Sequence, residues 1–270
     1  MANTYDPEIF VVNLKQDIQK RQHMIQKLDV LPFRYTFIEA VFGKELPQKY
    51  IDTIYDESRA VREFGRSLSR GEIGCALSHI GIYKKMVAEN IGIGVVLEDD
   101  ADIHPDFISV LNTMHKLPEQ WEILLLGYYS NTRSERMSIA SYRGKKPVTG
   151  SIECVRLVET AFGTHGYMIT RSGAEKMLRN IHKIVKPIDH YTGTEHYLNM
   201  YAVRPRVVTL NETFKQMGCI NDDRDGIAYK KSPSWLLLNK KKLANYLRGK
   251  NWFLYLKKLP ARIKKPRKYY

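Results

Sequence analysis

Four carboxylates stand within five residues near the middle of this chain, directly after the apolar run of residues 95–97. They are Glu98, Asp99, Asp100 and, after one intervening alanine, Asp102. Like charges this close repel one another, and each loses hydration when it approaches a folded interior. A divalent cation removes both costs, because carboxylate oxygens are the ligands that Mg²⁺ and Mn²⁺ prefer. The run therefore predicts a metal site, with a solvated acidic turn after a core strand as the alternative.

The spacing of these acids assigns them to two sides of the chain. In an extended segment, side chains two residues apart point to the same side. Glu98 and Asp100 therefore share one side, Asp102 continues it, and Asp99 points elsewhere. We expect Asp100 to be a direct metal ligand and Asp102 to be the next candidate ligand. A helix cap, or a partner for an arginine, is the structural alternative for Asp99.

The pattern of elements around the acids is that of an α/β fold. Residues 9–14 are typical of a buried strand, residues 17–28 of a helix and residues 34–40 of a second strand. A capping-box spacing from Ser69 to Glu72 opens a helix to about residue 87, and the acid-tipped strand 93–97 follows. Further strands are expected at 121–127, 166–170 and 204–210, with a capped helix from Ser172 to about Ile181. This alternation predicts a mixed, mostly parallel sheet, and open α/β sheets bind ligands beyond the carboxyl ends of their strands.

The charge of the chain is concentrated in its last forty residues. The 270 residues carry a formal net charge of +14, but residues 230–270 contain 14 Lys and Arg and no acid. The other 229 residues hold 43 − 14 = 29 bases against 29 acids, a balance of zero. We therefore predict one large domain over residues 1–228 and a separate basic segment over 229–270. Hydrophobic content of 43% is that of a globular protein.

Cysteine usage and the absence of long apolar stretches indicate a cytoplasmic setting. Cys75, Cys154 and Cys219 lie far apart and are odd in number, which argues against a disulfide framework or a structural zinc site. The first residues lack the basic and apolar regions of a signal peptide. No run reaches about 18 uncharged apolar residues, so we expect no membrane span.

Three motifs, in order along the chain, resemble glycosyltransferase family 25. They are residues 68–79 (LSRGEIGCALSH), residues 95–100 (VVLEDD) and residues 163–174 (GTHGYMITRSGA). Residues 12–15 with Arg21 are similar to the family's nucleotide-side motif, and residues 187–189 resemble its Pro-Val-Asp element. The resemblance covers roughly residues 8–225. It departs at residues 41–44, where an acid common in the family is missing, and residues 216–223 match only loosely.

The resemblance implies a GT-A-type, Rossmann-like fold, a nucleotide-sugar donor, a divalent cation and inversion at the anomeric carbon. A metal on the diphosphate would stabilise the leaving group, with Mn²⁺ or Mg²⁺ held by Asp100 and Asp102. Glu98 would contact the donor ribose or a metal-bound water. The other residues that the resemblance places at the donor are Val12, Asn13, Leu14, Arg21, Ser78, His79, Asp99, Gly163 and Thr164.

Several of these residues have ordinary structural alternatives. His79 could be a satisfied structural histidine of its helix, and Glu72 is explained as a cap residue by its spacing from Ser69. Arg21 could lie solvated on its helix instead of pairing with a diphosphate. Gly163 and Thr164 could form a simple strand entry instead of shaping the sugar pocket.

Inversion requires a base that deprotonates the acceptor hydroxyl on the face opposite the leaving group. By its family position Asp189 is the candidate, with His190 and Glu195 as competitors. The structural alternative is that Asp189 caps a turn between a helix and a loop.

The basic segment interleaves aromatic and aliphatic residues with Lys and Arg, as at residues 235–238 and 252–256. This pattern is typical of an interfacial helix on anionic lipid, and the alternative is a helix docked on the domain. The interpretation is a transferase, peripheral on the inner face of the cytoplasmic membrane, that extends a lipid-linked oligosaccharide of lipooligosaccharide with galactose from UDP-galactose. Rival hypotheses are transfer of glucose or an N-acetylhexosamine, a two-metal phosphoesterase, and a non-catalytic basic protein that binds membrane or nucleic acid. We expect no nucleic acid partner, because no recognition motif accompanies the charge.

Overall fold

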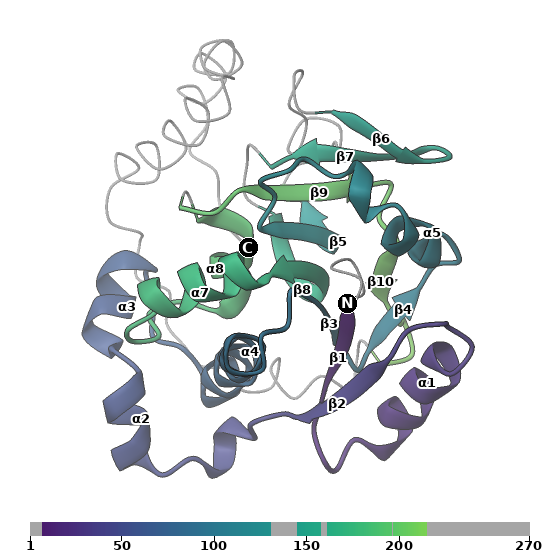
Figure 1. Cartoon of the computed structure of the whole chain (residues 1–270). Coiled ribbons are helices and arrows are strands. Elements are labelled where there is room, and N and C mark those ends of the chain that lie inside the picture. Colours follow the sequence, from purple (N-terminus) through teal and green to yellow (C-terminus); the bar gives the residue numbers. More distant parts are fainter. Residues whose placement is uncertain (1–6, 131–144, 158–160, 196, 215–270) are drawn as a thin grey trace, which may run out of the picture.

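The computed structural model describes residues 7–130, 145–157, 161–195 and 197–214. Within them one sheet of eight strands forms the centre of the molecule, in the order β2-β1-β3-β8-β5-β9-β7-β6 (Figure 1). The strands are β1 (Glu8–Asn13), β2 (Tyr35–Glu39), β3 (Ile93–Glu98), β5 (Ile123–Ser130), β6 (Lys146–Thr149), β7 (Ile152–Arg156), β8 (Ala161–Thr170) and β9 (Met200–Arg204). A separate pair joins β4 (Ala101–Ile103) to β10 (Val208–Leu210).

The sheet is mixed, as the sequence predicts. The pairings β1–β2, β1–β3 and β5–β9 are parallel, whereas β8 is antiparallel to both of its neighbours. Strand β7 is likewise antiparallel to β9 and β6. Six of the eight strands consequently point in one direction, and β7 and β8 run against them. The carboxyl ends of β1, β3 and β5 meet at one edge, where the first half of β8 also lies.

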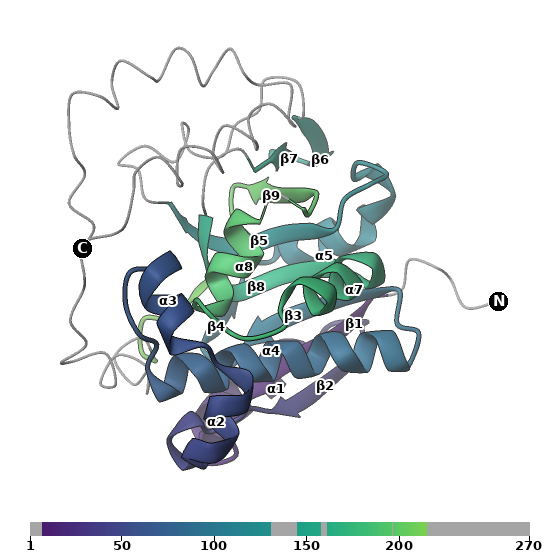
Figure 2. The ribbon, with the colours of Figure 1, turned by 90° about the vertical axis from the view of Figure 1, so that its left-hand side faces the viewer.

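Helices cover both faces of the sheet, which gives three layers (Figure 1). One face carries α4 (Arg70–Ala88), α7 (Arg171–Asn180) and α8 (Ile188–Thr194), and the other carries α1 (Ile18–Leu28) and α5 (Asp106–Asn112). Figure 2 looks onto the face that α4, α7 and α8 cover. The other helices within the described residues are α2 (Gln48–Ile54), α3 (Glu57–Glu63) and the short 3-10 turns η1 (Gly43–Glu45) and η2 (Met114–Lys116).

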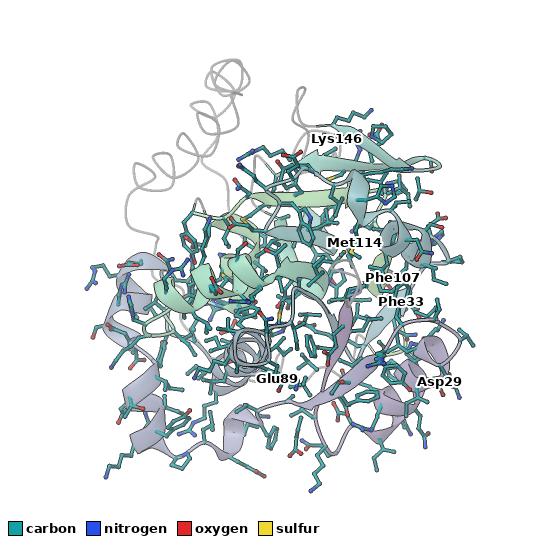
Figure 3. The ribbon with its side chains drawn as sticks, viewed as in Figure 1. Asp29, Phe33, Glu89, Phe107, Met114 and Lys146 are labelled. Atoms are coloured by element: carbon teal, nitrogen blue, oxygen red, sulfur yellow. The ribbon has the colours of Figure 1, made fainter. Side chains whose placement is uncertain are left out.

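Each face of the sheet has its own apolar core, because alternate residues of a strand point to opposite sides. In β1, Phe10 packs toward α4 whereas Ile9 packs toward α1. Phe107 of α5 and Met114 of η2 close the α1 side (Figure 3). The near-continuous apolar strands in the sequence are thus explained by burial on both faces. None of the helices in the described parts of the chain is long and apolar enough to span a bilayer.

The element boundaries depart from the sequence prediction at several places. Strand β8 begins at Ala161 instead of Gly166, and β5 covers Ile123–Ser130 instead of residues 121–127. Residues 204–210 do not form one strand: β9 ends at Arg204, Pro205 offers no N–H to a ladder, and β10 pairs instead with β4. Helix α7 is capped by Thr170, whose Oγ1 accepts from the N–H of Gly173, and it therefore begins before Ser172. The capping box at the start of α4 is present as predicted, with both the Ser69 and the Glu72 contact formed. The segment 229–270 lies outside the described residues.

Candidate active site

The acidic run lies at the carboxyl edge of the sheet and is held at both ends. In the ladder Glu98 is paired with Val12 of β1, so the acids that follow it come directly after β3. Beyond the turn, Asp102 of β4 is opposite Thr209 of β10. The N–H of Asn211 donates to the carbonyl oxygen of Asp100 at 2.8 Å. The turn that carries Asp99 and Asp100 is therefore fixed by backbone pairing on either side.

Glu98 points to the α4 side of the sheet, where two side chains contact its Oε1. The hydroxyl of Thr164 in β8 donates to that oxygen, and Nε2 of His79 lies 3.8 Å from it. The Glu98 side chain keeps 26% of its surface exposed, whereas His79 is fully buried. Burial alone would raise the pKa of Glu98, but its contacts with His79 and Thr164 outweigh burial and hold the pKa below its ordinary value. Glu98 is therefore a fixed, ionised carboxylate.

Asp99 points to the opposite, α1 side and belongs to a second network. Its Oδ2 accepts from Nδ2 of Asn13 at 2.8 Å, and its Oδ1 lies 3.5 Å from Nζ of Lys20. Nη1 of Arg21 donates to Oδ1 of Asn13 at 3.4 Å, and its guanidinium lies 3.9 Å from the centre of the Phe37 ring. Burial raises the pKa of Asp99 and outweighs Lys20 and Asn13, which act to lower it. The structure thus brings together the predicted residues Asn13, Arg21 and Asp99, and it gives Asp99 a lysine where the sequence alternative expected an arginine.

Asp100 is the acid with the greatest need of a cation. Its Oδ1 is buried and accepts no hydrogen bond from the residues that the structure describes. Burial, followed by the charges of Glu98 and Asp99, raises the pKa of Asp100 to about 7. A divalent cation fits this oxygen, because it would supply the missing partner and favour the ionised form. A merely solvated acidic turn would not bury a carboxylate oxygen without a partner, so the structure favours the metal site at Asp100 over that alternative.

Asp102 has polar and charged partners of its own. Its Oδ1 lies 3.4 Å from Nε2 of His23 and 3.5 Å from Nζ of Lys27, both in α1, and Oδ2 accepts from Asn211 at 3.3 Å. The ion pair with Lys27 already offsets its charge. Asp102 thus faces α1, and the prediction that it shares the side of Glu98 is wrong, because the turn between β3 and β4 interrupts the alternation of side chains. Its role as a metal ligand stays a prediction.

A second group could hold a metal ion, and sequence reasoning did not single it out. Single ligand atoms of Cys75, His79 and Glu98 lie within 4.8 Å of one another. The signal was available, since Cys75 and His79 are four residues apart and so share one face of α4. The described residues therefore offer a second metal position, which includes the carboxylate of Glu98, besides the one predicted at Asp100.

The remaining predicted donor residues take scaffold positions in this structure. Oγ of Ser78 accepts from the N–H of Val41 at 2.8 Å and donates to the carbonyl of Gly74 at 2.9 Å, which fastens α4 to the segment before η1. Val12 packs into the core on the α4 side. The carbonyl of Leu14 accepts from Asp17 at 2.9 Å at the start of α1.

The start of β8 requires glycine and carries a histidine that sequence reasoning left out. Gly163 has φ of +102°, and a Cβ there would lie 2.9 Å from the ring of His165. His165 is buried beside the exposed ring of Tyr129, with centroids 5.2 Å apart. Burial lowers the pKa of His165 despite the charge of Glu98. A neutral imidazole therefore lies near the acidic edge, next to the predicted Thr164.

Helix α8 brings the three candidate bases to this side of β8. Asp189 lies in its first turn, where Pro187 is the N-cap residue and makes no side-chain cap. The His190 ring packs between Phe64 and Phe162, at 4.8 and 4.4 Å between centroids. Glu195 is buried in an ion pair with Lys186. Because its carboxylate is already engaged by a lysine, Glu195 is less available to an acceptor hydroxyl, which favours Asp189 over that competitor.

An α/β sheet with fixed acids at its carboxyl edge defines a ligand-binding enzyme of the Rossmann-like class. The family model of glycosyltransferase family 25 (LPS biosynthesis protein) matches residues 6–192, and the chain belongs to that family. The match includes the acidic run, His79 and Asp189.

The curated relatives include proteins named as galactosyltransferases and one named as a probable inactive family member. Procollagen galactosyltransferase 1-A of Xenopus laevis is 31% identical over 195 residues, which is 68% of this chain and 30% of that protein. Probable inactive glycosyltransferase 25 family member 3 of Rattus norvegicus is 24% identical over 197 residues, 68% of this chain and 32% of that protein. The chain thus spans about a third of the length of these relatives. A solved structure, A197 from STIV, covers 75% of this chain and 82% of its own at 14% identity and a TM-score of 0.41, too distant a likeness to bear on function.

Proposed function

We propose that this chain is a metal-dependent, inverting glycosyltransferase that moves galactose from UDP-galactose onto an oligosaccharide of lipooligosaccharide or lipopolysaccharide. Family membership supports sugar transfer, and the family's description as an LPS biosynthesis protein supports the acceptor. The name of the frog relative supports galactose. The observation that carries the proposal is Oδ1 of Asp100, buried at the carboxyl edge without a hydrogen bond from the described residues.

The chain's own residues divide the work of the reaction. Asp100 would hold Mn²⁺ or Mg²⁺, which when bound neutralises the charge that grows on the departing diphosphate. Glu98, fixed by Thr164, accepts a hydrogen bond from the donor ribose. Arg21, held by Asn13 and Phe37, contributes positive charge on the nucleotide side. Asp189 takes the proton of the acceptor hydroxyl as the new glycosidic bond forms.

Binding of the donor is the first test, because it separates a transferase from a non-catalytic protein. UDP at 100 times its dissociation constant should raise the unfolding midpoint by about 5 °C with Mn²⁺ present and much less with EDTA. A donor-hydrolysis panel of UDP-galactose, UDP-glucose and UDP-N-acetylhexosamines then identifies the sugar. Asp100→Asn should abolish the Mn²⁺ dependence. Asp106→Asn is the matched control, since its carboxylate is exposed and paired only with His104 among the described residues. No response to UDP under either condition would exclude the transferase and favour the basic binding protein.

The base assignment is tested at Asp189. Asp189→Asn should lower kcat about 10²–10⁴-fold, because general base catalysis is lost, while the Kd of UDP changes less than twofold. Turnover near the wild-type value with intact donor binding would transfer the role to His190, for which His190→Phe is the next variant.

The basic segment 229–270 supports a peripheral place on the inner face of the cytoplasmic membrane, where a lipid-linked acceptor resides. Its 14 basic residues in 42 positions would be attracted to anionic headgroups by about 1 kcal/mol each near the surface. No nucleic acid partner is proposed.

A further inference from the structure

Behind Glu98 lies a chain of three buried polar side chains that the proposed reaction does not use. The hydroxyl oxygens of Tyr83 and Tyr167 are 2.7 Å apart, and the Tyr167 hydroxyl is 2.8 Å from Nδ1 of His79. All three side chains have no exposed surface. The His79 and Tyr167 rings stack at 21° with centroids 5.7 Å apart, and Nε2 of His79 faces Oε1 of Glu98.

The direction of these hydrogen bonds follows from Tyr83, the buried residue at the end of the series farthest from Glu98. Among the described residues, the Tyr83 hydroxyl has one hydrogen-bond partner, the Tyr167 hydroxyl. A buried O–H must donate, because leaving it unsatisfied costs about 1–3 kcal/mol. Tyr83 therefore donates to Tyr167. The Tyr167 proton is then directed at His79, so Nδ1 of His79 accepts.

The state of His79 is fixed by this direction. A neutral imidazole that accepts at Nδ1 carries its proton on Nε2, the nitrogen that faces Glu98. An imidazolium, or the Nδ1–H tautomer, would donate to the Tyr167 oxygen and leave the proton of either Tyr167 or Tyr83 without an acceptor among these three side chains. Two aromatic hydroxyls from α4 and β8 thus select one of three possible states of the histidine.

We propose that Tyr83 and Tyr167 are positioning residues that hold His79 as an Nε2–H donor toward Glu98 and thereby orient that carboxylate for the sugar-nucleotide donor. The proposal deepens the proposed function and rests on it for the identity of the ligand. His79 and Thr164 both contact Oε1. Oε2 takes part in neither contact and is the oxygen left to accept from the donor.

The direction of these hydrogen bonds also decides between the two candidate metal positions, the group of Cys75, His79 and Glu98 and the carboxylate of Asp100. With a proton on Nε2, His79 has no lone pair to offer a cation at the group of Cys75, His79 and Glu98. The cation is then held at Asp100. Mn²⁺ binding, measured by electron paramagnetic resonance of the free ion, should be unchanged in Cys75→Ser and lost in Asp100→Asn. Loss of Mn²⁺ binding in Cys75→Ser would overturn the proposal.

The tautomer can be read directly by long-range ¹H–¹⁵N correlation on protein labelled at histidine. At pH 7.5 the wild-type His79 signals should be those of the Nε2–H tautomer. Tyr167→Phe should shift them toward Nδ1–H, and Tyr83→Phe should do so in part. Tyr128→Phe is the matched control, because this buried tyrosine donates to the carbonyl of Val203 and takes no part in the hydrogen bonds that join Tyr83, Tyr167 and His79. The signals are assigned by their loss in His79→Gln. If that variant does not fold, they are assigned as those that move in both Tyr83→Phe and Tyr167→Phe.

Kinetics supply the functional half of the test. Tyr167→Phe should raise KM for the donor about tenfold with a smaller change in kcat, and Tyr128→Phe should change neither. An Nδ1–H tautomer or an imidazolium in the wild type, or signals that no variant moves, would overturn the proposal. The spectra do not depend on turnover. An Nε2–H tautomer in a protein that transfers no sugar would therefore reject the proposed function while the hydrogen-bond chain stands.

Discussion

Three consecutive carboxylates at the end of β3 exist in three different electrostatic environments. Glu98 is contacted by Thr164 and His79 and has a lowered pKa, whereas Asp99 is contacted by Lys20 and Asn13 and has a raised pKa. Asp100, with the weakest support, has a pKa of about 7. Residue type alone does not set these states, because burial and neighbouring charge decide which form is stable. The acid with the least support is the one that a cation would stabilise most.

Asp100 should therefore cost the protein stability in the absence of a cation. Its folded pKa is raised above its unfolded value, so the proton it binds in the fold stabilises the protein at low pH, and that contribution is lost as pH rises toward 7. Asp100→Asn should raise the free energy of unfolding by roughly 1–3 kcal/mol at pH 8 and by much less at pH 5. Urea denaturation with EDTA at both pH values measures this. An equal change at the two pH values would show that the carboxylate is not strained by burial.

The sequence located the acidic turn but could not identify its partners. An apolar strand followed by acids is a local pattern, so Asp100 could be expected at a sheet edge. Asn13 and Asp99 are 86 residues apart, and His79 and Tyr167 are 88 apart. Periodicity shows that Lys20 and Tyr83 lie on helices. It does not show which strand those helices face, because that depends on strand order.

At the scale of elements, a glycine allows α4 to pack closely against the segment before η1. A Cβ on Gly74 would overlap the carbonyl of Val41 and lie 2.7 Å from the amide nitrogen of Gly43. On Gly81 of the same helix, a Cβ would meet nothing within 4 Å. The capping box was readable from sequence because Ser69 and Glu72 are only three residues apart. The close approach at Gly74 was not, because its other side comes from the segment before η1.

This contrast gives a paired prediction. Gly74→Ala should destabilise the fold by about 2 kcal/mol or more, because backbone atoms must move to admit the methyl group. Gly81→Ala should stabilise it by about 0.5–1 kcal/mol through helix propensity. Both follow from chemical denaturation monitored by circular dichroism. A stabilising Gly74→Ala would mean that α4 does not pack against residues 41–43 as described.

At the scale of the whole molecule, the shared direction of most strands was predictable, whereas the strand order and the reversals of β7 and β8 were not. Apolar strands that alternate with helices predicted the parallel set, and six of eight strands share one direction. The reversal of β8 between β3 and β5 was beyond local patterns, because pairing partners are chosen by the packed core. That reversal brings the first half of β8, with Thr164 and His165, to the acidic edge.

The charge separation along the chain makes the last prediction. A chain ending at Tyr229 has a formal balance of zero, whereas residues 230–270 carry +14. The shortened protein should keep activity on a soluble acceptor, lose most binding to vesicles of phosphatidylglycerol and phosphatidylethanolamine, and show little salt dependence. Cosedimentation at 50 and 300 mM NaCl measures this. Equal vesicle binding by both lengths would refute the membrane proposal.

Glu98 and Asp99 point to opposite sides of the sheet, and this arrangement also affects how the site tolerates substitutions during evolution. Glu98 contacts His79 and Thr164 on one side of the sheet, and Asp99 contacts Asn13 and Lys20 on the other. Drift in one set should leave the other nearly untouched, since sites without shared partners behave additively. Epistasis should concentrate at Asp100, whose ionisation both neighbours oppose, so a lineage that abandons catalysis can be expected to lose that carboxylate first.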